Sequence, residues 1–163
     1  MLDFHTYKAY IFTMRSKSLL SFLVLLALPI MANAAVIETQ ALSFGEFAMR
    51  NNDASYDLTI SPTGGISRDP IFLPFEDPQP GSYAVSGFPA STALIINVTF
   101  NDLTGGGTQN FTISSAVISP STVTTDGAGE ASFNVGATLS SSGTGVVYSD
   151  STYNGLMTVS VNY

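Results

Sequence analysis

Four side chains between positions 51 and 57 have the spacing of a calcium-binding loop. They are Asn51, Asp53, Ser55 and Asp57. Such a loop places oxygen ligands at every second residue in its first half, as these four do. The rest of the pattern departs from it, because Tyr56 stands where the loop has glycine and Pro62 where it has a bidentate glutamate. A solvated turn is therefore the better interpretation, and calcium binding is the alternative.

Glu76 and Asp77 form a second acidic pair, which is flanked by prolines. This pair could join the 51–57 segment across loops, and paired carboxylates are also the acid and base of glycosidases. A glycosidase needs a cleft with aromatic side chains that stack on the sugar, and the chain has no tryptophan. We therefore assign no catalytic residue, no metal ligand and no cofactor-binding residue from the sequence.

The remaining composition excludes most catalytic chemistry. Beyond residue 34 the chain has no lysine, histidine, cysteine or tryptophan. This rules out Ser-His-Asp and Cys-His catalysis, Schiff bases, a P-loop lysine, and thiolate or imidazole zinc sites. The same part of the chain has two arginines against eleven carboxylates, which argues against nucleic acid as a partner. We expect a protein that is not an enzyme and needs no cofactor.

The amino terminus has the organisation of a cleaved signal peptide. Arg15 and Lys17 precede the apolar run 19–30, and the small residues of Ala32-Asn33-Ala34 follow it. The run is shorter than the about 20 residues that a membrane-spanning helix needs. We therefore expect export and cleavage after Ala34, with the mature protein in the periplasm, at the cell surface or outside the cell.

This cleavage divides the chain into a signal peptide, 1–34, and one domain, 35–163. Translation from Met14 would give a compact signal peptide, so residues 1–13 are candidates for a wrongly assigned translation start. The length of the mature part suits one hydrophobic core. Because it has no cysteine, its stability must come from apolar packing and backbone pairing.

Beyond Ala34 the apolar residues recur with a period of two, in short bursts separated by Gly, Pro, Asn, Asp and Ser. The predicted strands are 42–47, 56–60, 82–86, 93–100, 111–118, 133–139 and 157–163. The segment 68–80 is predicted to be a short edge strand or an ordered loop. No segment after residue 34 favours a helix. About eight short strands at this spacing predict an all-β protein, an antiparallel β-sandwich.

The turn residues and side-chain patterns add detail to this prediction. The spacing predicts a hairpin between 42–47 and 56–60, a central strand at 93–100, a hairpin turn at 126–129 and a flexible loop at 140–145.

Two glycines and the last residue carry further expectations. Gly45 predicts a bulge or a close backbone approach, and Gly155 a turn with positive φ. Tyr163 should face inward with the other alternate side chains of the last strand, which are Met157, Val159 and Val161.

Five motifs follow one another along the mature chain in a recognisable order. They are 42–47 (LSFGEF), 60–65 (ISPTGG), 83–87 (YAVSG), 133–139 (FNVGATL) and 153–163 (YNGLMTVSVNY). In this order they resemble the domain of unknown function 4402 family of exported bacterial proteins. The resemblance spans nearly all of the mature chain. It implies an immunoglobulin-like β-sandwich exported by a bacterium, and no assigned chemistry.

A more distant resemblance is to pilin and spore-coat-U-type β-sandwich subunits, whose chains finish in a glycine followed by an alternating strand that ends near a tyrosine. The chain departs from this pattern at two places. Tyr163 is the last residue and not the penultimate one, and the segment 35–41 is short for a separate donor arm.

We therefore expect an exported, non-catalytic structural or adhesive surface protein, with a pilin-like or coat subunit as one form. Its partners would be further copies or other cell-surface proteins, bound through strand edges. Two alternatives stay open. The alternating last strand with its terminal aromatic is typical of a small outer-membrane β-barrel, although the strands are shorter than the about 9–11 residues needed. A calcium- or carbohydrate-binding module is the other alternative.

Two glycosylation sequons begin at Asn97 and Asn110. Both lie in or beside predicted strands, and the signal is of bacterial type. We interpret both as chance matches.

Overall fold

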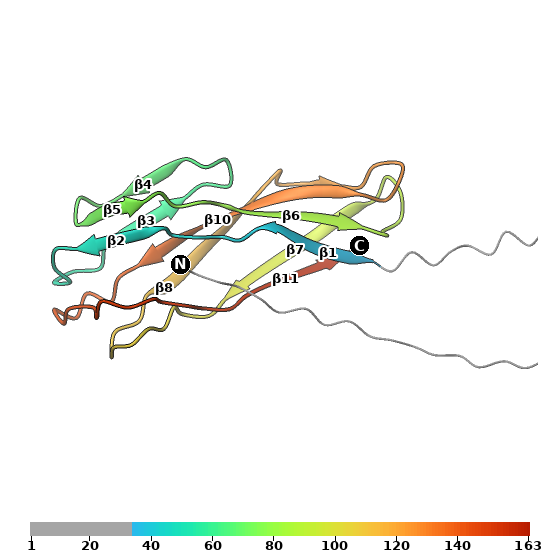
Figure 1. The fold of residues 1–163 in the computed structure, drawn as a ribbon. Coiled ribbons are helices and arrows are strands. Elements are labelled where there is room, and N and C mark those ends of the chain that lie inside the picture. The colour runs from blue at the N-terminus through green and yellow to red at the C-terminus, as the bar shows by residue number, and fades with distance from the viewer. Residues whose placement is uncertain (1–33) are drawn as a thin grey trace, which may run out of the picture.

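The computed structural model describes residues 34–163, which form eleven β-strands and no helix (Figure 1). The strands are β1 (Ala35–Gln40), β2 (Glu46–Met49), β3 (Asp57–Ile60), β4 (Ile66–Arg68), β5 (Phe72–Glu76), β6 (Gly81–Ser86), β7 (Ala93–Phe100), β8 (Thr112–Ser119), β9 (Val123–Thr124), β10 (Ala131–Ser140) and β11 (Met157–Asn162). Within this part of the chain no helix could span a membrane. The predicted signal peptide, apart from Ala34, lies outside the described residues.

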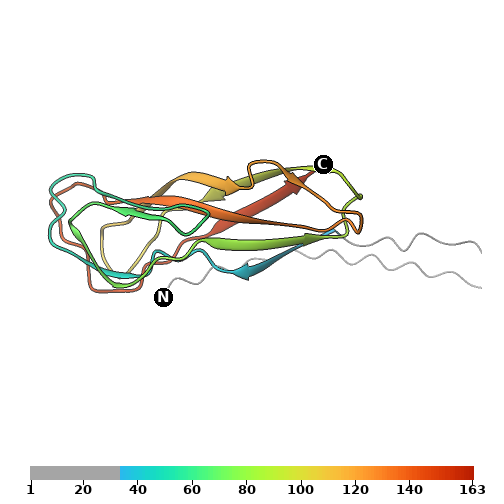
Figure 2. The same cartoon turned by 90° about the horizontal axis from the view of Figure 1, so that it is seen from above.

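All strand pairs are antiparallel, and the strands stack in two layers (Figure 2). One sheet has the order β1-β6-β10-β3-β4, with β8 on the other edge of β10. The other sheet has the order β11-β7-β9, and a short ribbon is formed by β2 and β5. The predicted all-β antiparallel sandwich is confirmed. Strand β7 lies between β11 and β9, but β9 pairs with it only at Ala93 and Leu94, so 93–100 is central only at its start.

Strand β10 is the centre of the fold. Its inward side chains, Phe133, Val135, Ala137 and Leu139, are at most 2% exposed, as the alternation predicts. The ring of Phe133 stacks on that of Tyr83 from β6, with centroids 5.3 Å apart. Burial of each large side chain contributes about 1.5–3 kcal/mol to stability.

Gly136 lies where β10 changes its neighbour. Residues 131–135 pair with β6, and residues 137–140 pair with β3 along the same edge. At the change the chain after β3 crosses close to β10, so that a Cβ atom on Gly136 would collide with the carbonyl oxygen of Ile60 and lie 2.7 Å from the nitrogen of Pro62. Glycine is therefore required here by space.

The predicted hairpin between 42–47 and 56–60 is wrong. Strand β2 pairs with β5, while β3 pairs with β4 and β10. The tight turn is instead at 61–65, where the amide of Ser61 donates to the carbonyl of Gly65 (2.8 Å) and Gly64 has φ +85°. Residues 35–40, for which the sequence pattern predicts no strand, form β1 at the sheet edge beside β6.

Gly45 has the role that the sequence predicts. Its φ is +73°, and a Cβ atom there would collide with the carbonyl oxygen of Glu76. The register of β2 against β5 shifts between Glu46 and Phe47. The extra residue of this shift is Phe75 on β5, since Glu46 lies opposite Glu76 and Phe47 opposite Pro74. Phe44 is buried, Phe47 is half-buried and Glu46 is exposed.

Three further expectations need correction. The turn at 126–129 is present, but the strands that it joins, β9 and β10, belong to different sheets and do not pair.

Gly155 does not have positive φ. Glycine is required there by space, since a Cβ atom would lie 2.6 Å from Leu103 Cδ2 and 3.0 Å from the carbonyl oxygen of Asn101. Tyr163 is 72% exposed, with its ring edge against Phe88.

Replacement of Gly136 by alanine should lower the free energy of unfolding by about 2–3 kcal/mol, because the two backbone segments must separate to admit a methyl group. Urea denaturation measures this. Gly127→Ala is the matched control, since nothing lies within 4 Å of its Cβ position and its φ is not positive, and it should be near neutral. Equal losses in the two variants would contradict the packing argument.

Asp126 should make stability depend on acidic pH. Its Oδ1 accepts the amides of Glu130 (2.9 Å) and Ala128 (2.8 Å), and these hydrogen bonds lower the pKa of the carboxyl below its usual range. The unfolded chain therefore binds the proton more tightly. The stability from this group is present above the unfolded pKa and is lost as the pH falls through the folded pKa.

In Asp126→Asn the acceptor oxygen remains but the charge is absent. The wild-type protein should be the more stable of the two near neutral pH, and the difference should shrink as the pH falls below about 4. Chemical denaturation between pH 2 and pH 7 gives the difference. A difference that is constant over this range would exclude the proposed titration.

Candidate binding cleft

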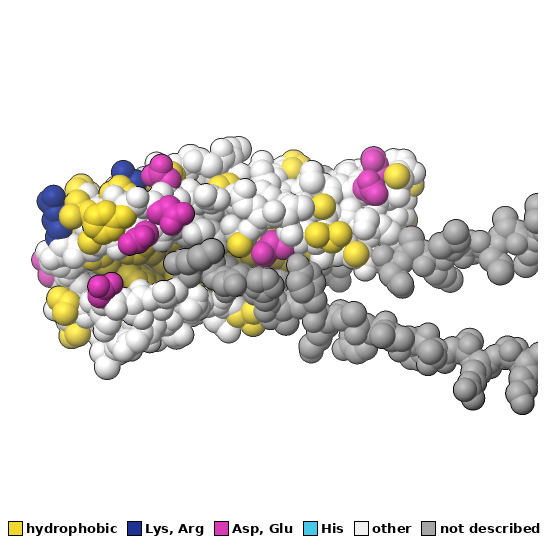
Figure 3. All heavy atoms as spheres, viewed as in Figure 1, with side chains coloured by type: hydrophobic (Ala, Val, Ile, Leu, Met, Phe, Trp, Pro, Cys, Tyr) yellow, Lys and Arg dark blue, Asp and Glu magenta, His cyan; other side chains and the backbone are white. Residues whose placement is uncertain are grey.

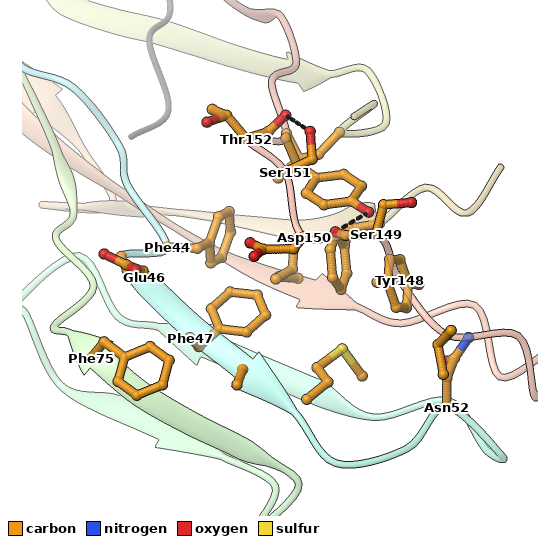
Figure 4. A pocket seen from close by; sticks show the side chains of 18 of the residues that line it. Phe44, Glu46, Phe47, Asn52, Phe75, Tyr148, Ser149, Asp150, Ser151 and Thr152 are labelled. Carbon is orange, nitrogen blue, oxygen red and sulfur yellow. Dashed lines mark hydrogen bonds between the residues drawn. The ribbon is translucent and has the colours of Figure 1, made fainter. Parts of the chain in front are cut away.

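A cleft of about 650 Å³ lies between the β2–β5 ribbon and the segment 147–153. It opens at the end of the molecule where β2 and β5 lie, and its apolar hollow is flanked by acidic side chains (Figure 3). In the close-up, Phe47 and Phe75 come from neighbouring strands of one wall, and the Asp150 side chain projects from the opposite wall (Figure 4).

The floor of the cleft is a cluster of aromatic rings. Phe47 meets Phe111 edge to face, with ring centroids 5.7 Å apart. Phe111 stacks on Tyr148 at 4.0 Å, and Tyr153 packs against both of these rings at 5.1 and 5.8 Å. Phe111 is buried, whereas Phe47 and the two tyrosines are half-buried and line the cleft. Such interlocked rings give the floor a fixed shape.

The tyrosine hydroxyls are held by the protein. Tyr148 Oη accepts the amide of Ser142 (2.7 Å) and donates to the carbonyl of Asn110 (3.1 Å). Tyr153 Oη donates to the carbonyl of Ser149 (3.1 Å), and burial raises the pKa of Tyr153 above its usual value. A ligand in the cleft would therefore meet the rings as apolar surfaces.

The rim of the cleft exposes both apolar and polar groups. Phe75 on one wall is 72% exposed and Val147 on the other is 76% exposed. Large apolar side chains this exposed on both sides of one hollow are typical of a binding surface. The polar groups of the rim include the carboxylates of Glu46 and Asp150, the hydroxyls of Ser149, Ser151 and Thr152, and the amide of Asn51. Among the described residues that line the cleft there is no lysine, arginine or histidine.

Asn52 fixes the loop that leads into the second wall. It is 3% exposed. Its Nδ2 donates to Ser142 Oγ and to the carbonyl of Val146, both at 2.8 Å, and its Oδ1 accepts the amide of Gly143 at 2.9 Å. Its backbone carbonyl accepts the amide of Gly145 at 2.6 Å. The side chain of Asn52 thus makes the hydrogen bonds that a neighbouring strand would otherwise make to this loop.

Gln109 supports the same loop from the other side. Its Oε1 accepts the hydroxyls of Ser142 and Thr144, both at 2.7 Å. The loop predicted to be flexible at 140–145 is therefore anchored at several points. Sequence analysis missed Asn52 because nothing in the local pattern distinguishes it from Asn51.

The four residues with calcium-loop spacing are each engaged separately. Asn51 lines the cleft and is exposed. Asp53 Oδ1 accepts the hydroxyl of Tyr56 (2.7 Å), and this hydrogen bond raises the pKa of the tyrosine. The other two side chains bond to the strand end opposite: Ser55 Oγ donates to the carbonyl of Ser141, and Asp57 Oδ1 accepts the hydroxyl of Ser140. These bonds agree with a turn.

No metal cluster is formed in the part of the chain that the structure describes: within 34–163, three or more His, Cys, Asp or Glu side chains do not gather at any point. Glu76 does not join the 51–57 segment in the sheet, because it lies opposite Glu46 in the β2–β5 register.

One of three comparisons with known proteins gives a match. The family described as Domain of unknown function (DUF4402) matches residues 35–163, from the first residue of β1 to the residue after β11. No curated protein and no solved structure matches the chain. The likeness to pilin and spore-coat-U-type subunits therefore stays a prediction.

Asn52→Ala should lower the free energy of unfolding by about 3 kcal/mol, because several buried loop groups lose their partner together. The amides of Gly143 and Gly145 should also exchange faster with solvent. Asn51→Ala, at the exposed neighbouring position, is the control and should change stability by less than about 0.5 kcal/mol. Similar values for the two variants would show that the loop does not depend on Asn52.

Proposed function

The chain belongs to the Domain of unknown function (DUF4402) family, and we propose that it is an exported, non-catalytic adhesive surface protein that binds a neutral glycan in its cleft. The observation that carries this proposal is the cleft itself: an aromatic floor between two rims that bear hydroxyls, carboxylates and exposed apolar side chains. Small-molecule sites combine an apolar lining with a few convergent polar groups in this way.

The chemistry of the rim favours a sugar over other ligands. A glycan presents many hydroxyl donors, which the carboxylates of Glu46 and Asp150 can accept, and apolar ring faces, which pack on aromatic side chains. An anionic ligand is disfavoured, because both charged groups of the rim are negative. The rigid floor also lowers the entropy lost on binding, since the rings are already held in place.

The composition supports binding without catalysis. The part of the chain beyond residue 34 has no histidine, cysteine or lysine to serve as a nucleophile or base, so the carboxylates of Glu46 and Asp150 are the groups of the cleft that a test for hydrolysis must address. The rings of the cleft floor contact one another, and the hydroxyls of its two tyrosines donate to backbone carbonyls. The signal-like residues 1–34 support export, and the net charge of -7 supports solubility of a surface protein.

Phe75→Ser should weaken glycan binding at least about tenfold, because Phe75 is the most exposed aromatic ring of the cleft. The measurement is affinity electrophoresis and calorimetry of the full chain with neutral polysaccharides, namely a β-glucan, a galactan and a mannan, and with anionic alginate. Ile95→Ser, another large exposed side chain but on β7 and outside the cleft, should bind like the wild-type protein.

Two results would contradict this proposal. Binding that is lost equally in the two variants, or absent for every neutral polysaccharide, would remove the cleft as a glycan site. Release of reducing ends from a polysaccharide that binds would overturn the non-catalytic part.

A further inference from the structure

We propose that the cleft selects among glycans by charge and binds most tightly a sugar unit in which a protonated amino group replaces a hydroxyl group. The inference rests on the proposed function, because it uses the same cleft and names the class of glycan with the highest affinity. The observations that carry it are the unpartnered carboxylates of the rim and the aromatic rings beneath them.

The carboxylates of the rim have no partner within the described part of the chain. Between residues 34 and 163, the side chains of Glu46 and Asp150 accept no hydrogen bond and form no ion pair. Both are exposed, and they come from opposite walls, Glu46 from β2 and Asp150 from the segment 147–153. In Figure 4 the Asp150 side chain points from its own wall toward the wall that bears Phe47. A ligand between the walls would therefore meet two free anionic acceptors.

A third carboxylate adds negative charge beside Glu46. Glu76 on β5 lies directly opposite Glu46 in the register of the β2–β5 ribbon, and like charges in this position destabilise a strand pair. Glu76 also has no hydrogen-bond or ion-pair partner for its side chain among the described residues. Natural proteins keep unfavourable local arrangements of this kind mainly at functional sites. A cation bound at this rim would relieve the repulsion.

No basic side chain of the described residues compensates this charge. The part of the chain beyond residue 34 has eleven carboxylates and two arginines, Arg50 and Arg68. Neither arginine lines the cleft, and neither forms an ion pair within the part that the structure describes. A cleft with charges of one sign and apolar walls concentrates the field of those charges and attracts the opposite charge. The cleft should therefore attract cations.

The aromatic rings favour the same kind of ligand. A cation is attracted to the electron-rich face of an aromatic ring, and the attraction is stronger where the cation is shielded from water. Phe75, on the same wall as Glu46, is 72% exposed, and Tyr148 and Tyr153 line the floor. A neutral hydroxyl group gains neither this attraction nor the stronger hydrogen bond that a charged donor makes to a carboxylate.

The other groups of the cleft indicate a sugar as the carrier of the amino group. A metal ion needs several ligands close together, and within residues 34–163 no three His, Cys, Asp or Glu side chains gather in this way. The hydroxyls of Ser149 and Thr152 can bond to sugar hydroxyls, and the volume of about 650 Å³ suits a ligand of several atoms more than a single ion. An ammonium group has three donors, which can reach acceptors on both walls.

Two oligosaccharides test the inference: a glucosamine oligomer and a glucose oligomer with the same linkage and length. They differ in having an amino group or a hydroxyl group on each sugar unit. Calorimetry of the full chain at about pH 6, where amino groups carry a proton, should show at least about tenfold tighter binding of the glucosamine oligomer. The preference should shrink as the ionic strength rises from about 0.01 M to about 1 M, because salt screens exposed charges.

Three variants locate the preference in the cleft. Glu46→Gln and Asp150→Asn should each reduce it at least about threefold, because one charged acceptor is lost. Binding of the glucose oligomer should change little, since an amide oxygen still accepts a hydroxyl group. Glu130→Gln is the matched control, because it removes the same charge from an exposed side chain that does not line the cleft, and it should keep the preference. Thermal unfolding checks that all three variants are folded.

An oligolysine with the same number of charges tests whether charge alone is sufficient. It should bind less tightly than the glucosamine oligomer, because it has no sugar rings for the floor of the cleft. Equal affinities for the two sugars, a preference that Glu46→Gln and Asp150→Asn leave intact, or an oligolysine that binds as tightly as the glucosamine oligomer would overturn the inference.

The two proposals fail in different ways. Neutral polysaccharides that bind in the cleft without any gain from an amino group would overturn only the preference for the amino sugar. A glucosamine oligomer that binds in the cleft, with no binding of any neutral polysaccharide, would overturn only the proposal that the cleft binds a neutral glycan.

Discussion

The pairing of β10 along both of its edges is the constraint on which the rest of the structure depends. Its residues 134–140 pair with β8, while the other edge pairs first with β6 and then with β3. One strand thus joins segments from almost the whole chain, and its inward side chains form the middle of the core. Because the chain has no disulfide to hold these segments, this backbone pairing and the burial that it creates must do so.

The cleft depends on the same strand. Where β10 ends, the chain has no further ladder partner, and the side chain of Asn52 provides hydrogen bonds in its place. This fixes the start of the segment whose later residues, Tyr148 and Tyr153, complete the aromatic floor. The opposite wall is set by the β2–β5 ribbon, in which Phe47 is half-buried against the floor and Glu46 lies at the rim. The site is thus built where regular pairing stops.

Alternation of side chains was sufficient to predict β6, β7, β10 and β11, because each buries one face. It could not predict the pairing of β2 with β5 or the strand β1, since partners are chosen by contacts between distant segments. The cleft could not be predicted for the same reason. Nothing in the sequence pattern indicates that Phe47, Phe75 and Tyr148 line one cleft. Their exposed surfaces become a site only because the ribbon and the 147–153 segment meet.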